Sequence, residues 1–160
     1  MPKYGLATIL EDYPVGYEFT GDNIPLHLTH VDSFVVDLST EELAARLQSA
    51  LAEQQSFSVK ALRDELYGPD KDIPVTVLEL TPELQSLHNT LMNLLEQEGA
   101  ILKNPHFHRD GFMPHVSVYG DRRVTVGENI RIKDISIAAK LSEEENAKRR
   151  ILATISLKEA

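Results

Sequence analysis

The sequence predicts an α+β protein, a bilobed two-layer fold in which helices flank antiparallel sheets and a central cleft separates pseudo-twofold, duplicated lobes. Strand-like segments are numerous, whereas only two segments have a long helical apolar stripe. The tripeptides His27-Leu28-Thr29 and His115-Val116-Ser117 repeat one pattern 88 positions apart, each within a strand-like run. With 160 residues, 42% of them apolar, residues 1–160 are expected to form a single domain whose core needs no disulfide.

The first half of the chain is predicted to contain four strands and one helix. Ser39 or Thr40 caps the helix, because Glu42 stands at the capping-box position, and the helix is expected to end near Gln55. A Gly68-Pro69-Asp70 turn separates the last two strands. The strands are expected over residues 4–10, 26–36, 57–66 and 73–80, with a loop over 11–24.

The second half begins with a helix that Thr81 caps, that has Pro82 at its first position and that Gly99 ends. His88 lies on the apolar face of this helix and is interpreted as a core histidine. The remaining elements are a polar loop over 103–111, strands over 112–119, 131–141 and 151–157, and a charged linker over 142–150.

The two repeated tripeptides place chemistry on one face of each strand. Because strand side chains alternate, His27 and Thr29 share a face, as do His115 and Ser117, while the apolar residues between them face a core. His30 faces away from His27 and is interpreted as structural. Two such strands, brought together, supply two imidazoles that suit the base and acid roles near neutral pH, and two hydroxyls that donate to phosphate oxygens.

These motifs resemble the 2H phosphoesterase superfamily, also called the 2′-5′ RNA ligase-like or cyclic phosphodiesterase family. The resemblance covers residues 26–157 and departs from the family in His30, where an apolar residue is usual, and in Ser117, where Thr is usual. The helix that commonly follows the first strand is expected to be absent or very short, because residues 11–24 are loop-like. The resemblance implies a bilobed fold and metal-independent hydrolysis of a 2′,3′-cyclic phosphate or a related cyclic or 2′-5′ nucleotide linkage. It also implies His115 as the base and His27 as the acid, with no cofactor.

Three alternatives stay open at this point. The chain is a nucleotide- or RNA-end-binding regulatory protein with little turnover, or a metal-dependent hydrolase that uses His106, His108 and His115, or the two motif histidines have no role. Several residues are also candidates for substrate contact. The phosphate-binding candidates are Thr29 and Ser117, and the further candidate substrate contacts are Tyr4, Arg109 and Tyr119, with Phe112, Arg122 and Arg123 as weaker ones.

Charge and composition narrow the partners. The net charge is −9, and residues 1–99 carry 5 basic and 17 acidic residues against 11 and 8 in residues 100–160. An acidic protein is a poor binder of long nucleic acids, so the expected partner is a small nucleotide or an RNA end. The chain has no cysteine and no apolar run long enough to span a bilayer, and a cytoplasmic protein with no membrane partner is expected. The oligomeric state is not readable from the sequence.

Overall fold

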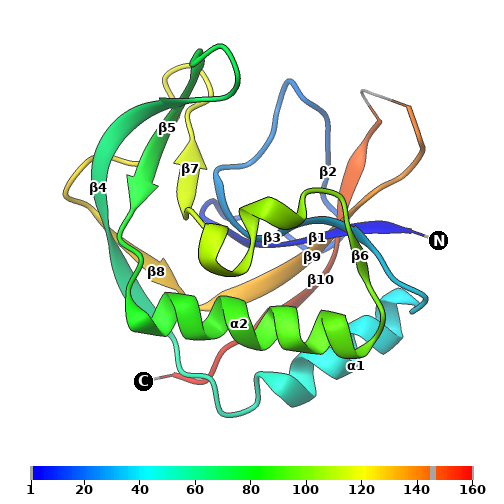
Figure 1. The fold of residues 1–160 in the computed structure, drawn as a ribbon. Helices are drawn as coiled ribbons and strands as arrows, with labels where there is room; N and C mark the ends of the chain where they lie inside the picture. The colour runs from blue at the N-terminus through cyan, green and yellow to red at the C-terminus, as the bar shows by residue number, and fades with distance from the viewer. Residues whose placement is uncertain (1, 145–146, 160) are drawn as a thin grey trace.

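The computed structural model describes residues 2–144 and 147–159, which form an α+β fold, as predicted (Figure 1). Ten strands of the described chain make one sheet of antiparallel pairs, in the order β2-β10-β9-β1-β3-β7-β5-β4-β8, with β6 paired to β3. The strands are β1 (Lys3–Ile9), β2 (Glu18–Phe19), β3 (His27–Val35), β4 (Phe57–Tyr67), β5 (Ile73–Leu78), β6 (Ile101–Leu102), β7 (His115–Ser117), β8 (Asn129–Ile132), β9 (Asp134–Lys140) and β10 (Arg149–Ser156). The helices are α1 (Thr40–Ala50) and α2 (Pro82–Gln97).

The predicted lobes correspond to the two halves of this one sheet, which meet where β3 pairs with β7. In Figure 1, β4, β5 and β7 rise on one side, while β1, β3 and β9 cross the centre. The hairpin of β4 and β5 follows β3 in the sequence, but it joins the half of the sheet that contains β7, through the pairing of β5 with β7. The hairpin of β9 and β10 follows β7, but it joins the half that contains β3, through the pairing of β9 with β1. The two histidine strands therefore meet in the middle of the sheet.

Both predicted helix starts are confirmed. Ser39 Oγ accepts from the Glu42 amide at 3.1 Å, and the Glu42 carboxylate accepts from the Ser39 amide at 3.1 Å, which completes the capping box. Thr81 Oγ1 accepts from the Leu84 amide at 3.2 Å, with Pro82 at the first position of α2. Helix α1 ends at Ala50, earlier than predicted, because the chain turns there to pair its next residues with Lys158.

The core lies between the sheet and the two helices, which run side by side below it in Figure 1. Leu28 and Val116, the central residues of the two tripeptides, are fully buried in this core, as the strand alternation predicted. The helices contribute an apolar stripe at helical spacing. Its fully buried leucines are Leu43 and Leu47 of α1, and Leu84, Leu87, Leu91 and Leu95 of α2. The opposite face of the sheet is thus left for the cleft.

Three predicted segments differ in the structure. The strand expected over 112–119 is only β7, because Pro114 has no amide for the ladder and two 3-10 turns occupy residues 105–111. The strand expected over 131–141 is split at Lys133 into β8 and β9, because these two pair with different neighbours. The loop over 11–24 contains the short strand β2, which pairs with β10. Among the helices of the described residues, none has the length and apolar character that a membrane span requires.

Candidate functional site

The pairing of β3 with β7 brings the two tripeptides together. Leu28 pairs with Val116, and the pair is antiparallel. The residues on either side therefore face each other across the strands: His27 lies opposite Ser117, and Thr29 lies opposite His115. Side chains at opposite positions have Cβ atoms about 5 Å apart. The two imidazoles and two hydroxyls thus form one group on the cleft face of the sheet.

Both motif histidines are held in the same way. His27 Nδ1 lies 2.8 Å from the carbonyl oxygen of Pro25, and His115 Nδ1 lies 2.8 Å from that of Met113. A carbonyl oxygen only accepts, so each Nδ1 carries a hydrogen and donates it. In the neutral ring the basic nitrogen is then Nε2. The same tether at equivalent positions gives both imidazoles a fixed tautomer with the reactive nitrogen available.

The proton affinity of His27 reflects its surroundings. Burial lowers its pKa below the usual value of 6.5, against the opposing effect of the Pro25 carbonyl, and the charges of His115 and Arg149 lower it further. Because a proton on one imidazole disfavours a proton on the other, the state with both rings charged is disfavoured. Paired acid–base catalysis needs one neutral and one charged ring.

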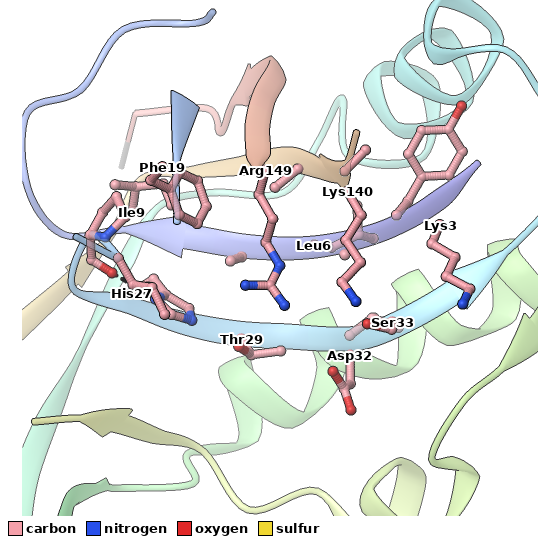
Figure 2. Close-up of a pocket in the computed structure, with 18 of the residues that line it drawn as sticks. Lys3, Leu6, Ile9, Phe19, His27, Thr29, Asp32, Ser33, Lys140 and Arg149 are labelled. Atoms are coloured by element: carbon pink, nitrogen blue, oxygen red, sulfur yellow. Dashed lines mark hydrogen bonds between the residues drawn. The ribbon is translucent and has the colours of Figure 1, made fainter. Parts of the chain in front are cut away.

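The cleft has two unlike halves on either side of this group. On the side of β1, β9 and β10, a cavity of about 250 Å³ is bordered by Lys3, Lys140 and Arg149 (Figure 2). On the side of β5 and β7, a cavity of about 600 Å³ has a mostly apolar lining. Its large apolar and aromatic residues are Leu66, Tyr67, Ile73, Phe107, Phe112 and Met113. Thr29 borders both cavities, and the ring of Tyr67 meets that of His115 edge-on at 4.9 Å.

His88 and His108 hold the loop over 103–111 in place. His88 Nδ1 donates to the His30 carbonyl at 2.8 Å, and its Nε2 accepts from the Arg109 amide at 2.9 Å. His108 Nδ1 donates to the Asn104 carbonyl at 2.9 Å, and its Nε2 accepts from the Asp32 amide at 3.1 Å. All four ring nitrogens are therefore committed to the backbone, which supports the interpretation of His88 as a core residue.

These commitments also bear on the metal alternative. With both ring nitrogens of His108 engaged, this residue has no lone pair left for a metal, while His106 is exposed on the surface. No group of three or more potential metal ligands occurs among the described residues. The residues named for a metal site therefore do not converge.

Two of the three further contacts expected from the sequence have polar groups engaged with other parts of the protein. Tyr4 faces the core with 2% of its surface exposed, and its hydroxyl donates to the Leu38 carbonyl at 3.0 Å. Arg109 is held against α2, where its guanidinium donates to Asn93 at 2.9 Å and pairs with Glu96 at 2.7 Å. Tyr119 does border the basic cavity.

The weaker candidates are also occupied elsewhere. Phe112 is buried and stacks on His88, with ring centroids 4.0 Å apart. Arg122 pairs with Glu11, and Arg123 pairs with Asp64. Phe112 nevertheless lines the apolar cavity, whereas the two arginines are engaged by these carboxylates.

Sequence reasoning missed Tyr67, Lys140 and Arg149, which border the cleft beside the motif residues. Lys140 and Arg149 come from strands that are distant in the sequence from either tripeptide, so only the sheet order brings them near. One signal was present: two consecutive arginines at the start of a strand must point to opposite faces. Arg149 faces the cleft, and Arg150 pairs with Glu18 instead.

Comparison with known proteins identifies the family. The model of the 2′-5′ RNA ligase superfamily matches residues 14–133. Similar solved structures include a phosphoesterase (TM-score 0.59, 18% identity, 99% of each chain covered) and Escherichia coli LigT complexed with 3′-AMP (0.58, 18%, 99% of each). A protein of Thermus thermophilus gives a TM-score of 0.63 at 16% identity over 98% of each chain. A search of curated proteins finds no match. At these identities the structures show a shared fold, and the family model covers most of the chain: the protein belongs to the 2′-5′ RNA ligase superfamily.

Proposed function

We propose that the protein is a phosphodiesterase that opens a 2′,3′-cyclic phosphate, or a related cyclic or 2′-5′ nucleotide phosphodiester, by metal-independent catalysis with paired histidines. The matched tethers of His27 and His115 carry this proposal. Each ring is fixed through Nδ1 and leaves Nε2 for proton transfer in one cleft. Thr29 and Ser117 stand beside the rings as hydroxyl donors.

The reaction follows from these four side chains. One imidazole, neutral at Nε2, takes a proton from a water molecule whose oxygen forms a bond to phosphorus. The bond from phosphorus to one ribose oxygen breaks, and the protonated Nε2 of the other imidazole gives its proton to that leaving oxygen. Thr29 and Ser117 donate hydrogen bonds to the non-bridging oxygens as charge builds up. The product is a phosphomonoester, and the proton has moved from one histidine to the other.

The two roles are set by where the proton resides. The resemblance implies His115 as the base and His27 as the acid. In the free protein the lowered pKa of His27 favours its neutral form, which suits the base. A phosphodiester anion next to the ring raises this pKa and restores the acid form. The order of roles is therefore decided in the substrate complex.

The apolar half of the cleft supports a nucleotide as the substrate. Tyr67, Phe107 and Met113 border a cavity of about 600 Å³ directly beside His115. Aromatic and apolar walls of this kind stack on a nucleobase. One protein of similar fold, Escherichia coli LigT, has been solved in complex with the nucleotide 3′-AMP.

The test is an assay of the chelator-treated protein against nucleoside 2′,3′-cyclic phosphates, 3′,5′-cyclic nucleotides and 2′-5′-linked dinucleotides. We expect turnover of at least one of them, undiminished after metal removal, because the histidine pair supplies both proton transfers. Activity that returns only when a divalent metal is restored would refute the mechanism. Tight binding of these nucleotides without any turnover would instead indicate a nucleotide-binding regulatory protein of the same fold.

Thr29→Val and Ser117→Ala are expected to lower kcat by about 10²-fold each, because each removes one donor to the developing phosphate charge. Both hydroxyl side chains are half-buried and neither is part of the core, so the thermal midpoint should change little. Steady-state kinetics and thermal unfolding of the same preparations check both statements. Unchanged kcat in both variants would remove the hydroxyls from the proposed mechanism.

A further inference from the structure

The basic cavity beside His27 has a chemical character that the reaction itself does not need. Lys140 and Arg149 lie directly opposite each other on β9 and β10, and Lys3 follows on β1. Figure 2 shows the three side chains side by side, with their nitrogen-bearing ends directed across the sheet toward β3. Three cations around one small cavity are unexpected in a chain of net charge −9.

The floor of this cavity is built to admit a ligand between the cations. Gly5 pairs with Ala138 on the neighbouring strand, and both border the cavity, as does Ala7. Small residues at these positions leave the sheet surface open, while the long cationic side chains and the ring of Phe19 stand around it. A volume of about 250 Å³ is enough for a phosphate group.

The positive charge of the cavity is only weakly neutralised within the described residues. Lys3 pairs with Glu143, which is largely exposed, whereas Lys140 and Arg149 make no ion pair with any described residue. The carboxylate of Asp32 is the acidic group on the cavity border, but it accepts a hydrogen bond from Asn104 at 2.7 Å. In Figure 2 it points away from the three cationic side chains.

The strands that carry Lys140 and Arg149 lie at a distance from the histidines that would hold the reacting phosphate. The backbones of β9 and β10 lie two and three strands away from β3, roughly 10–14 Å at about 4.8 Å per strand. Their side chains reach back over part of this distance, and the charge of Arg149 is still felt at His27. The three cations are therefore in a position to bind a second anionic group of the same ligand, next to the reacting phosphate.

We propose that Lys3, Lys140 and Arg149 form a subsite for a second phosphate of the substrate, so that a nucleotide with both a cyclic and a terminal phosphate is preferred over one with the cyclic phosphate alone. This inference rests on the proposed function and narrows its substrate class. The nucleobase lies in the apolar half beside His115, the reacting phosphate lies between the histidines, and the second phosphate lies in the basic half. Charge-assisted hydrogen bonds to phosphate give this preference its strength.

The test compares adenosine 2′,3′-cyclic phosphate with the same compound carrying a 5′-phosphate. We expect kcat/KM to be about 10- to 100-fold higher for the 5′-phosphorylated compound, since charge-assisted hydrogen bonds to the second phosphate strengthen its binding. In Lys140→Gln and Arg149→Gln this ratio should fall toward one. Lys60→Gln is the matched control, because Lys60 is an exposed lysine on β4, and it should keep the wild-type ratio.

Equilibrium binding keeps this test independent of turnover. Adenosine 3′,5′-bisphosphate should bind the wild-type protein more tightly than 3′-AMP, and Lys140→Gln and Arg149→Gln should abolish the difference. Failure to hydrolyse either cyclic compound would refute the proposed function, and the binding comparison would still decide on the subsite. Equal affinity for the two nucleotides, or an equal loss with both in the variants, would show that the cations do not recognise a second phosphate.

Discussion

His27→Asn and His115→Asn are each expected to lower kcat for the phosphodiester by about 10²–10⁴-fold, the usual contribution of one acid or base. Asparagine keeps a side-chain N–H near the position of Nδ1, so the hydrogen bond to the carbonyl of Pro25 or Met113 is preserved in kind. It has no group that exchanges a proton near neutral pH. The loss therefore measures proton transfer rather than a change in structure.

Single-turnover kinetics of these two variants, of the double variant and of His106→Ala check the expectation. The double variant should be little worse than either single one, because two groups that act as a unit are not additive. His106 is exposed and belongs to the metal alternative, so its variant should keep the wild-type rate. A large loss in His106→Ala together with normal rates in either asparagine variant would contradict the histidine pair.

The pH dependence provides a second measure of the same pair. Below the lower pKa both rings are protonated and no base remains, while above the higher one both are neutral and no acid remains. Burial and the charge of His115 lower the pKa of His27, so the acid limb of kcat/KM should lie below pH 6.5. A rate that stays constant from pH 5 to 9 would exclude catalysis by this pair.

Local sequence signals predicted those parts of the fold that are decided locally. The capping box at Ser39, the Thr81-Pro82 start of α2 and the alternation around Leu28 each depend on neighbours within a few residues, and each is seen in the structure. The two tripeptides likewise required only their own pattern. Their meeting at one cross-strand pair is a property of the whole sheet, and for that the repeated motif was the only sign.

The errors arise where long-range pairing decides. Arg109 looked free in a polar loop, but α2 supplies Asn93 and Glu96 as its partners from earlier in the chain. Tyr4 was expected as a cleft residue, yet the cleft face of β1 carries its odd-numbered residues, and this parity is fixed by the pairing of β1 with β3 and β9. No local pattern contains that information.

A β-bulge in β3 shows the same limit within one strand. Thr29 pairs with Ala7 and Val31 pairs with Leu6, so His30 is the extra residue between them. The bulge buries His30 and Val31 together and returns Asp32 to the border of the cleft. His30 was expected to face away from His27, and it does lie buried, with 1% of its surface exposed.

The buried histidines predict a steep loss of stability in mild acid. His30 Nε2 donates to Thr8 Oγ1 at 2.7 Å, since that hydroxyl itself donates to the Asp134 carbonyl, and His30 Nδ1 has no partner among the described residues. Burial lowers the pKa of His30 to about 3 and that of His88 to about 4. The charge of His88 lowers the pKa of His30 further, and the charge of His108 lowers that of His88 further. In the folded protein neither ring accepts a proton until the pH is well below 6.5, whereas in the unfolded chain both rings are protonated from about pH 6.5 downward.

Because both folded-state values lie below the unfolded value of 6.5, the stability is complete above that pH and falls as the pH drops toward 4. Each histidine contributes a slope of about 1.4 kcal/mol per pH unit, so the free energy of unfolding should fall by roughly 5 kcal/mol between pH 6.5 and 4.5, which approaches the whole stability of a typical domain. Urea unfolding at a series of pH values measures this slope. In His30→Gln, whose amide keeps the donor to Thr8 without titrating, the slope should be about half as steep, whereas exposed His106→Ala should leave it unchanged. A free energy of unfolding that stays constant from pH 7 to 4.5 would mean that the rings of His30 and His88 are protonated in the folded protein without a cost in stability.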